Sequence, residues 1–265
     1  MLLATWNVNS LPARMPRVLE WLDRVRPDVV CLQETKIANA AFPHAELQEL
    51  GYASAADGDG RYNGVAIASR VGLDDVSRGF AGEPGFPSLE KRALAATCQG
   101  VRVWSLYVPN GRTPDSPAFE YKLAWLQALR TAAGEELARW PLLALCGDFN
   151  VAPGDEDVWD PQAFVGATHV TPAERRAVGE LLELGLNDVH PRALKGAPFT
   201  YWDYRAGMFH KGEGMRIDLV LLSEPLAARV KDAYIDRDAR KGSKPSDHAP
   251  VVVELELEPA TADST

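Results

Sequence analysis

The chain has 265 residues, of which 46% are hydrophobic and 25% charged, as is usual for a folded globular protein rather than a disordered one. Its mean hydropathy is −0.19 and no apolar run approaches the ~20 residues that cross a bilayer, so we expect no membrane partner. The net charge of −9 and the sequence pI near 5.1 argue weakly against nucleic acid, although a local basic strip can still hold phosphates.

The N-terminal segment and the cysteines bear on the cellular compartment. Residues 1–7 carry no basic segment and become polar too early for a secretory signal peptide. Cys31, Cys98 and Cys146 lie in separate apolar runs without a Cys-x-x-Cys pattern, which is typical of small buried hydrophobes in a reducing compartment. We therefore expect a cytoplasmic protein.

Eight apolar or alternating runs predict β-strands. In chain order they cover residues 2–8, 28–32, 64–69, 93–98, 101–108, 142–146, 218–222 and 251–257. Helical periodicity covers residues 17–26, 119–140 and 171–184, and the last of these begins with a capping-box sequence that has Pro at its first helical position. Many strands with few helices between them predict an α/β protein in which two packed sheets are flanked by helices. We expect one domain over residues 1–258 and a flexible tail over 259–265.

An Asp and an Asn follow the apolar run 141–146, in the segment GDFN at 147–150. Asp148 and Asn150 are two residues apart at a strand end, so both project to one side of it. A carboxylate that accepts a proton, beside an amide that holds geometry, can aim a water at an electrophile. The segment therefore predicts a hydrolytic site at this strand end.

Polar residues also end the first two predicted strands. Glu34 follows the apolar run 29–32 and suits a hard divalent cation such as Mg²⁺, which takes one or two carboxylates and keeps several waters. The alternative is a surface Glu paired with Lys36. Asn7 and Asn9 end the first strand, where Asn7 could support the metal ligand or contact phosphate; the alternative is an Asx-turn that ends the strand.

Three further strand ends add candidates. Tyr107 offers a hydroxyl donor and Asn110 an amide after the run 101–108, with a core Tyr as the alternative. Asp218 opens one apolar strand, and His248 precedes another. A histidine that stays cationic beside a phosphate benefits from a carboxylate partner, and Asp218 is the best candidate. The set is typical of metal-assisted attack of water on a phosphodiester.

With these motifs in their order, the chain resembles the exonuclease III family of apurinic/apyrimidinic endonucleases, in the endonuclease/exonuclease/phosphatase superfamily. The matching segments are WNVN at 6–9, PDVVCLQETK at 27–36, YNGVA at 62–66, YVPNG at 107–111, GDFN at 147–150, FTYWDYR at 199–205, RID at 216–218 and PSDHAP at 245–250. They extend over residues 1 to about 257, and the combination is specific although each motif alone is not.

The resemblance implies a four-layer α/β sandwich with two packed mixed β-sheets and a divalent-metal site at one edge. It implies Mg²⁺ as the cofactor, with Mn²⁺ as a possible substitute. The metal site would draw on Glu34, Asn7, Asp148, Asn150, Asp247 and His248. The catalytic residues would be Tyr107 at the scissile phosphate, Asp148 as proton acceptor, Asn150 to position the water, and the supporting pair Asp218 and His248.

The implied reaction is cleavage of the phosphodiester 5′ to an abasic site in duplex DNA, which leaves a 3′-hydroxyl. Related activities are 3′→5′ exonuclease and 3′-phosphatase or phosphodiesterase. The partner would be double-stranded DNA with abasic or 3′-blocked sites, met by a monomer in the cytoplasm at the nucleoid. DNA contacts are expected from Asn110, Arg112, Tyr201, Trp202, Met215 and Ile217. Basic residues that could meet phosphates are Arg14, Arg17, Lys36, Arg61, Lys91, Arg92, Arg112, Lys122, Lys211, Arg216, Arg240, Lys241 and Lys244.

Tyr201 departs from the family pattern, which commonly has Trp or Phe in the loop against the abasic sugar. Met215 likewise replaces a bulkier aromatic of some relatives, so the two positions put substrate preference in question. We expect Tyr201, Trp202, Met215 and Ile217 to form the walls of a small apolar pocket that admits a bare sugar and excludes a base.

Two other functions share part of this pattern. A phosphodiesterase or phosphatase of the same superfamily that acts on lipids, inositol phosphates or nucleotides would share Glu34, Asp148, Asn150 and His248. It should lack the segments at 199–205 and 216–218. A non-catalytic binding module on the same fold is the second alternative, because fold alone does not determine function. Cleavage of an abasic duplex with magnesium, and its loss with EDTA, separates these possibilities.

Overall fold

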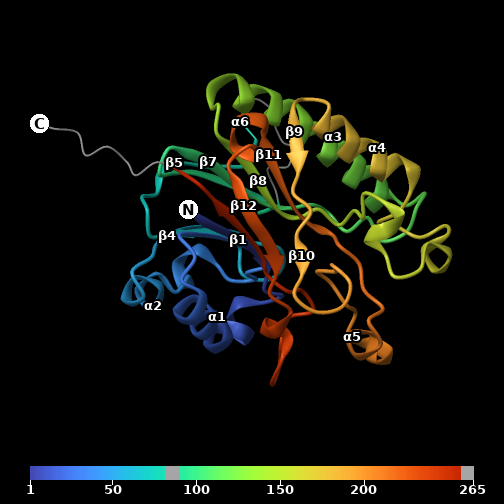
Figure 1. Cartoon of the computed structure of the whole chain (residues 1–265), viewed down its shortest axis with the longest axis horizontal. Coiled ribbons are helices and arrows are strands. Elements are labelled where there is room, and N and C mark those ends of the chain that lie inside the picture. Colours follow the sequence, from blue (N-terminus) through green and yellow to red (C-terminus); the bar gives the residue numbers. More distant parts are fainter. Residues whose placement is uncertain (81–89, 258–265) are drawn as a thin grey trace, which may run out of the picture.

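Two β-sheets packed face to face form the centre of the molecule, and helices cover the outer face of each sheet (Figure 1). The computed structural model describes residues 1–80 and 90–257. Within these residues the first sheet has the strand order β10-β12-β13-β1-β2-β4-β3 and the second has the order β5-β6-β7-β8-β11-β9. The predicted four-layer α/β sandwich is confirmed; the predicted tail at 259–265 lies outside the described residues.

Both sheets are mixed. In the first sheet β1 is parallel to β2 and antiparallel to β13. In the second, β7 is parallel to β8 and antiparallel to β6. The strands of the first sheet are β1 (Leu2–Asn7), β2 (Val29–Gln33), β3 (Ala53–Asp57), β4 (Val65–Ser69), β10 (Arg192–Ala193), β12 (Val230–Ile235) and β13 (Val251–Leu255). Those of the second are β5 (Asp74–Arg78), β6 (Ala93–Cys98), β7 (Val101–Tyr107), β8 (Leu143–Asp148), β9 (Leu186–Asp188) and β11 (Asp218–Ser223).

Three apolar layers hold the sandwich together. The central one lies between the sheets and includes Leu3, Val103 and Val220, each fully buried. Burying one such side chain contributes about 1.5–3 kcal/mol. The other two layers lie under the helices, where Trp21 of α1 and Leu129 of α3 pack on opposite outer faces.

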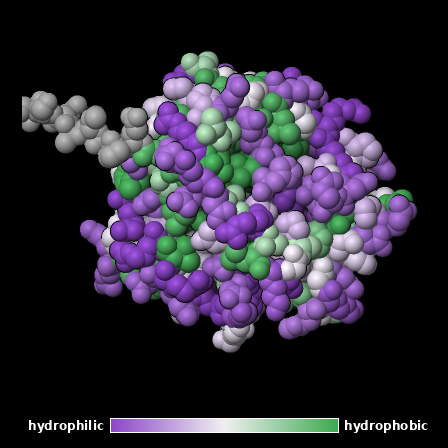
Figure 2. Space-filling model, in the orientation of Figure 1, coloured by the Kyte–Doolittle hydropathy of each residue, from purple (hydrophilic) through white to green (hydrophobic). Residues whose placement is uncertain are grey.

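The helices follow from their caps and apolar faces. They are α1 (Leu11–Val25), α2 (His44–Glu49), α3 (Pro117–Arg139), α4 (Pro172–Leu182), α5 (Met208–Lys211) and α6 (Glu224–Ala227). The predicted capping box of α4 is present: the Thr171 hydroxyl accepts from the Glu174 N–H and the Glu174 carboxylate accepts from the Thr171 N–H. The face of the molecule shown in Figure 2 is largely hydrophilic, with apolar side chains in small patches. Among the described residues no helix is long and apolar enough to span a membrane.

Several elements differ from the sequence-based expectation. Helix α1 begins at Leu11 instead of residue 17, because Pro12 lies in its first turn and Pro16 is tolerated inside it. Strand β13 ends at Leu255, two residues earlier than expected. The strands β3, β5, β9, β10 and β12 and the short helices α2, α5 and α6 were not predicted. Their sequences carry little periodic signal, as in the largely exposed DDVSR of β5.

Candidate active site

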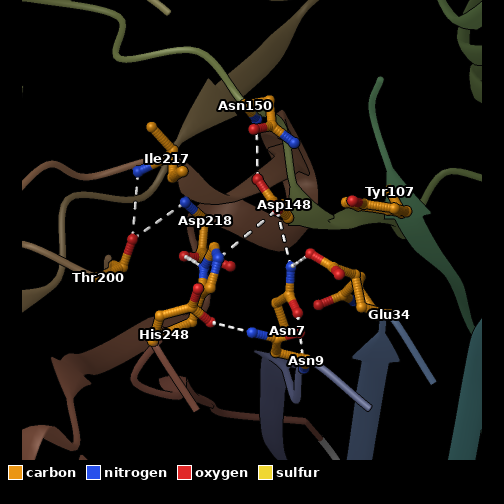
Figure 3. Close-up of polar contacts among 12 residues, drawn as sticks. Asn7, Asn9, Glu34, Tyr107, Asp148, Asn150, Thr200, Ile217, Asp218 and His248 are labelled. Atoms are coloured by element: carbon orange, nitrogen blue, oxygen red, sulfur yellow. Dashed lines mark hydrogen bonds and ion pairs between the residues drawn. The ribbon is translucent and has the colours of Figure 1, made fainter. Parts of the chain in front are cut away.

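Strand register brings three predicted residues into one row. In the second sheet Tyr107 of β7 lies opposite Asp148 of β8, and Asp148 lies opposite Asp218 of β11. In the first sheet Asn7 ends β1 and Glu34 follows β2 directly. His248 precedes β13, which is paired with β1. These strand ends converge, so the polar side chains form one group at the edge of the sandwich (Figure 3).

The Asn7 amide lies between two carboxylates of this group. Its Nδ2 donates to Glu34 Oε1 at 2.8 Å and to Asp148 Oδ2 at 2.9 Å. One ligand atom each from Glu34, Asp148 and His248 lies within 4.8 Å of the others. Among the described residues, this is the cluster of His, Cys, Asp and Glu side chains whose ligand atoms lie close enough together to hold a metal ion. Its carboxylate oxygens are the ligands that a hard divalent cation prefers.

Asp148 has the pKa expected of a proton acceptor near neutral pH. Its carboxyl is buried, and burial raises its pKa to about 7. His248 opposes this rise, whereas the Asp218 and Glu34 carboxylates add to it. A carboxylate with this pKa can take a proton from a water and is still ionised in a useful fraction of molecules.

His248 is held between two carboxylates. Its Nδ1 is 2.8 Å from Asp218 Oδ2 and its Nε2 is 3.8 Å from Asp148 Oδ2. Burial opposes the charged imidazole, but the charge and hydrogen bond of Asp218, together with the charges of Asp148 and Asp247, outweigh burial and raise the pKa of His248 to about 10. The ring is therefore cationic at neutral pH and suits a donor to a phosphate oxygen better than a metal ligand.

Glu34 stays ionised although it is mostly buried. Burial alone would raise its pKa, but the Lys36 ammonium, 2.7 Å from Glu34 Oε2, lowers it below the ordinary value. The backbone of Glu34 has φ 50°, in the left-handed region that a non-glycine residue seldom adopts. This sharp turn directly after β2 keeps the carboxylate at the sheet edge.

Tyr107 remains a neutral donor. Burial, then the charges of Glu34 and Asp148, raise the pKa of its hydroxyl well above the ordinary value. The Arg92 guanidinium lies 4.6 Å from the centre of its ring. In Figure 3 the hydroxyl of Tyr107 points into the polar group.

Asn150 is tied to its surroundings through both ends of its amide. Its Nδ2 donates to the Val108 carbonyl at 3.0 Å, and its Oδ1 accepts from Asn110 Nδ2 at 3.1 Å. Its main-chain N–H donates to Asp148 Oδ1 at 2.9 Å. The structure thus brings Asn110 and Asn150 together at the predicted site. Their hydrogen bonds connect the loop that follows β7 with the loop that follows β8.

The predicted apolar pocket is only partly supported. Trp202 was expected in its wall, but it is 1% exposed and packs in the core between the sheets, so that assignment is wrong. Met215 and Ile217 are 6% and 2% exposed and form a small buried cluster with Ala152 and Val158, so they do not line an open cavity. Tyr201 does face the site, with its ring centre 4.9 Å from that of His248.

Two further assignments change and one stays a prediction. Asp247 is not part of the Glu34, Asp148 and His248 group, and its carboxylate accepts from Asn9 Nδ2 at 3.1 Å; its place in or next to the metal site stays a prediction. Arg216 was a candidate for phosphate contact, but it is buried and paired with Asp157 and Asp188 at 2.6 and 2.8 Å. Lys122 is likewise buried in an ion pair with Glu174. Such buried cations cannot reach DNA phosphates.

The sequence interpretation missed several supporting residues. The Thr200 hydroxyl accepts from the N–H groups of Ile217 and Asp218, both at 3.1 Å, and so fixes the start of β11. Ser246 Oγ donates to the Asn7 carbonyl at 2.7 Å. His169 Nδ1 lies 2.6 Å from the Asn150 carbonyl. Thr200 and Ser246 lie within the matched motifs and could have been proposed, whereas no local pattern marks His169.

Residues 4–248 match the model of the endonuclease/exonuclease/phosphatase family. The chain belongs to this family. It is 34% identical to the exodeoxyribonuclease of Bacillus subtilis, over 95% of this chain and 98% of that one. It is a hydrolase of the exodeoxyribonuclease III type, as its motifs indicated.

Two solved structures are also similar. The 3′–5′ exonuclease NExo of Neisseria meningitidis is 42% identical with a TM-score of 0.92, over 97% of this chain and 100% of that chain. An AP endonuclease from Archaeoglobus fulgidus is 38% identical with a TM-score of 0.90, over the same shares of the two chains. Members of the exonuclease III branch therefore include proteins named for exonuclease and for abasic-site activity.

Proposed function

We propose that the protein repairs DNA by metal-dependent hydrolysis of phosphodiesters, cleaving 5′ to abasic sites in duplex DNA and removing blocked or terminal groups from 3′ ends. The observation that carries the proposal is the convergence of Glu34, Asp148 and His248 within 4.8 Å at the sheet edge. Each has a distinct electrostatic state: an ionised Glu, an Asp with a pKa near 7 and a cationic His.

The three protonation states suit these groups to different roles in hydrolysis. Asp148 accepts the proton of the attacking water, and Asn150 holds that water in line. His248, held by Asp218, donates to a phosphate oxygen and stabilises the charge that develops there. Tyr107 is a second neutral donor at the phosphate. A bound divalent cation would supply Lewis-acid polarisation of the phosphate oxygens.

Mg²⁺ fits the residues present. Glu34 supplies an ionised oxygen ligand, and Asp148 supplies a second carboxylate nearby. Mg²⁺ binds through one or two carboxylates and keeps several waters, so Glu34 can hold it while Asp148 is left to take the proton. Mn²⁺, with the same preference for oxygen, is the expected substitute.

Two observations support DNA as the substrate. A structure of NExo, named there a 3′ phosphatase, holds a product DNA hairpin and is 42% identical to this chain with a TM-score of 0.92. The rim of the site also carries exposed cations: Arg112 follows Asn110, and Arg61 lies in the loop whose Asn63 carbonyl accepts from the Lys36 N–H. We propose a single catalytic domain over residues 1–258, active as a monomer in the cytoplasm on nucleoid DNA.

The test compares three matched duplexes with one strand labelled: an internal abasic site, a nick with a 3′-phosphate, and a blunt end. Each is incubated with Mg²⁺, with Mn²⁺ and with EDTA. We expect incision with a 3′-hydroxyl product at the abasic site and phosphate release at the nick, both abolished by EDTA. No metal-dependent product from any of the three duplexes would refute the proposal.

A further inference from the structure

A buried lysine lies directly behind the loop that carries Asn150. Lys122 belongs to α3 and is 0% exposed. Its Nζ donates to the Asn150 carbonyl at 2.6 Å and to the Asn110 carbonyl at 3.2 Å, and it forms an ion pair with Glu174. An ammonium has three N–H donors, and these three acceptors are its nearer partners, with Thr168 Oγ1 farther away at 3.5 Å.

Glu174 extends this network to a third loop. The side chain is fully buried at the start of α4. Its Oε1 accepts from the Thr168 hydroxyl at 2.7 Å and from the His169 N–H at 2.9 Å. Its Oε2 accepts from the Thr171 N–H at 3.0 Å. One ion pair thus joins the segments at 109–112, 149–152 and 168–171.

Asn150 depends on such external donors. Its φ of 51° lies in the left-handed region, which a residue with a Cβ occupies only where its surroundings hold it. Its carbonyl receives two donors, Lys122 Nζ and His169 Nδ1, each at 2.6 Å. The Asn150 N–H, on the preceding peptide unit, donates to Asp148 Oδ1, so a change in the backbone dihedrals of Asn150 would disturb this hydrogen bond and the direction of the Asn150 amide together.

We propose that Lys122 is a positioning residue for hydrolysis, which acts by holding the Asn150 main chain so that Asn150 and Asp148 stay aligned with the attacking water. The role rests on the proposed function. It is distinct from that of a charge which contacts DNA, because Lys122 is inaccessible. Misplacing a reacting group by about 1 Å can lower a rate by about 10²-fold, so the effect should fall on kcat.

The test is a double-mutant cycle with Lys122→Met and Asn150→Ala, measured as kcat and KM on the duplex that the wild type hydrolyses fastest. We expect Lys122→Met to lower kcat by about 10–100-fold with KM within about twofold of wild type. In the Asn150→Ala background the same change should cost less than in the wild type, because the Asn150 amide is already lost and only the alignment of Asp148 is left to disturb.

Arg102→Met is the matched control. Arg102 is also buried and paired with a carboxylate of α3, Glu136 at 2.7 Å, but it lies at the opposite end of β7 from Tyr107. The Arg102→Met substitution should lower the melting temperature but leave kcat close to that of the wild type. If Lys122→Met does not fold, the double variant Lys122→Met/Glu174→Gln takes its place in the cycle, because it removes both buried charges.

Amide hydrogen exchange gives a readout without turnover. Residues 149–152 should exchange faster in Lys122→Met but not in Arg102→Met. If the fold losses in kcat of Lys122→Met and Asn150→Ala multiply in the double variant, the positioning role is overturned. Unchanged hydrogen exchange at residues 149–152 in Lys122→Met would also overturn it. A wild type that hydrolyses none of the duplexes would instead contradict the proposed function, and the exchange measurement would still decide the role of Lys122.

Discussion

At the scale of single residues, the site works because neighbouring charges give chemically similar groups different protonation states. Glu34 and Asp148 are both mostly or fully buried carboxyls, yet Lys36 lowers the pKa of Glu34 while burial raises that of Asp148. Asn7 donates to both. One carboxylate is therefore suited to hold a cation and the other to take a proton.

Substitution of the proposed proton acceptor tests this division directly. Asp148→Asn keeps the size of the side chain but removes its ability to accept a proton. We expect cleavage to fall by about 10²–10⁴-fold while the Kd for an abasic duplex stays within a few-fold of wild type. Single-turnover cleavage and fluorescence anisotropy measure the two quantities. Near-normal cleavage would show that another group takes the proton.

The pH dependence follows from the same carboxyl. Asp148 must be ionised to act, so the rate should rise with pH through about 7, the raised pKa of this group. A divalent cation adds positive charge beside it and should shift that rise to lower pH. Single-turnover rates between pH 5.5 and 8.5 at several Mg²⁺ concentrations measure the shift. If the pH at which the rate rises did not depend on the Mg²⁺ concentration, Asp148 would not lie beside the bound cation.

The proposed metal ligand has a test of its own. Glu34→Gln removes the ionised oxygen but keeps the shape, so half-maximal activity should require more Mg²⁺ and saturated turnover should fall by orders of magnitude. A magnesium titration of both proteins measures this, with Glu136→Gln, on the outer layer, as the control. An unchanged titration would assign the cation to other residues.

At the scale of elements, the site exists because polar residues end adjacent strands of both sheets. The close fit of β7 against β8 places Tyr107 opposite Asp148. Gly147, one residue earlier, lies opposite Leu106 with φ 155°, and a Cβ there would lie 1.9 Å from the Leu106 carbonyl oxygen. This strand pair therefore permits only glycine next to Asp148, the proposed proton acceptor.

A pair of glycine substitutions tests that close approach. Gly147→Ala must push β7 and β8 apart, so we expect the free energy of unfolding to fall by about 1–3 kcal/mol or more and cleavage to fall with it. Gly134→Ala is the control, since Gly134 lies in α3 with no atom within 4 Å of an added Cβ. It should raise stability by about 0.4–1 kcal/mol. Chemical denaturation measures both, and a stable, active Gly147→Ala would contradict the argument.

At the scale of the whole molecule, an acidic protein must still bind a polyanion. The net charge of −9 opposes association over long range, so affinity depends on cations at the rim of the site. Many other basic residues are already engaged, as Arg24 is with Asp236 and Arg192 is with Asp232. Arg61 and Arg112 are exposed near the polar group and remain the best candidates.

Salt dependence provides the test. We expect log Kd for an abasic duplex to rise linearly with log salt, with a slope of about 0.9 for each phosphate neutralised. Arg112→Ala should lower that slope by about one. Arg130→Ala is the control, because Arg130 pairs with Glu180 on the outer helical layer. Equal slopes for wild type and Arg112→Ala would remove Arg112 from the interface.

Much of this protein could be predicted from its sequence, because the strongest signals are local. Apolar runs predicted the central strands. The polar residues at the ends of these runs were the candidate site residues Glu34, Tyr107, Asp148, Asp218 and His248. A strand end is a position that periodicity and composition both mark, and the motifs at these ends matched one family in order. The two-sheet architecture followed from the same runs.

The tertiary structure decided what no local pattern contains. Whether an aromatic or a cation is buried depends on its partners in distant segments, so Trp202, Arg216 and Lys122 were misplaced from sequence alone. Short strands such as β5 owe their conformation to pairing with a neighbour and carry no apolar period of their own. The protonation states of Asp148 and His248 likewise arise from charges that are distant in the chain, such as Asp218, 30 residues from His248, and Glu34, 114 residues from Asp148 (148 − 34), and only the folded arrangement brings them together.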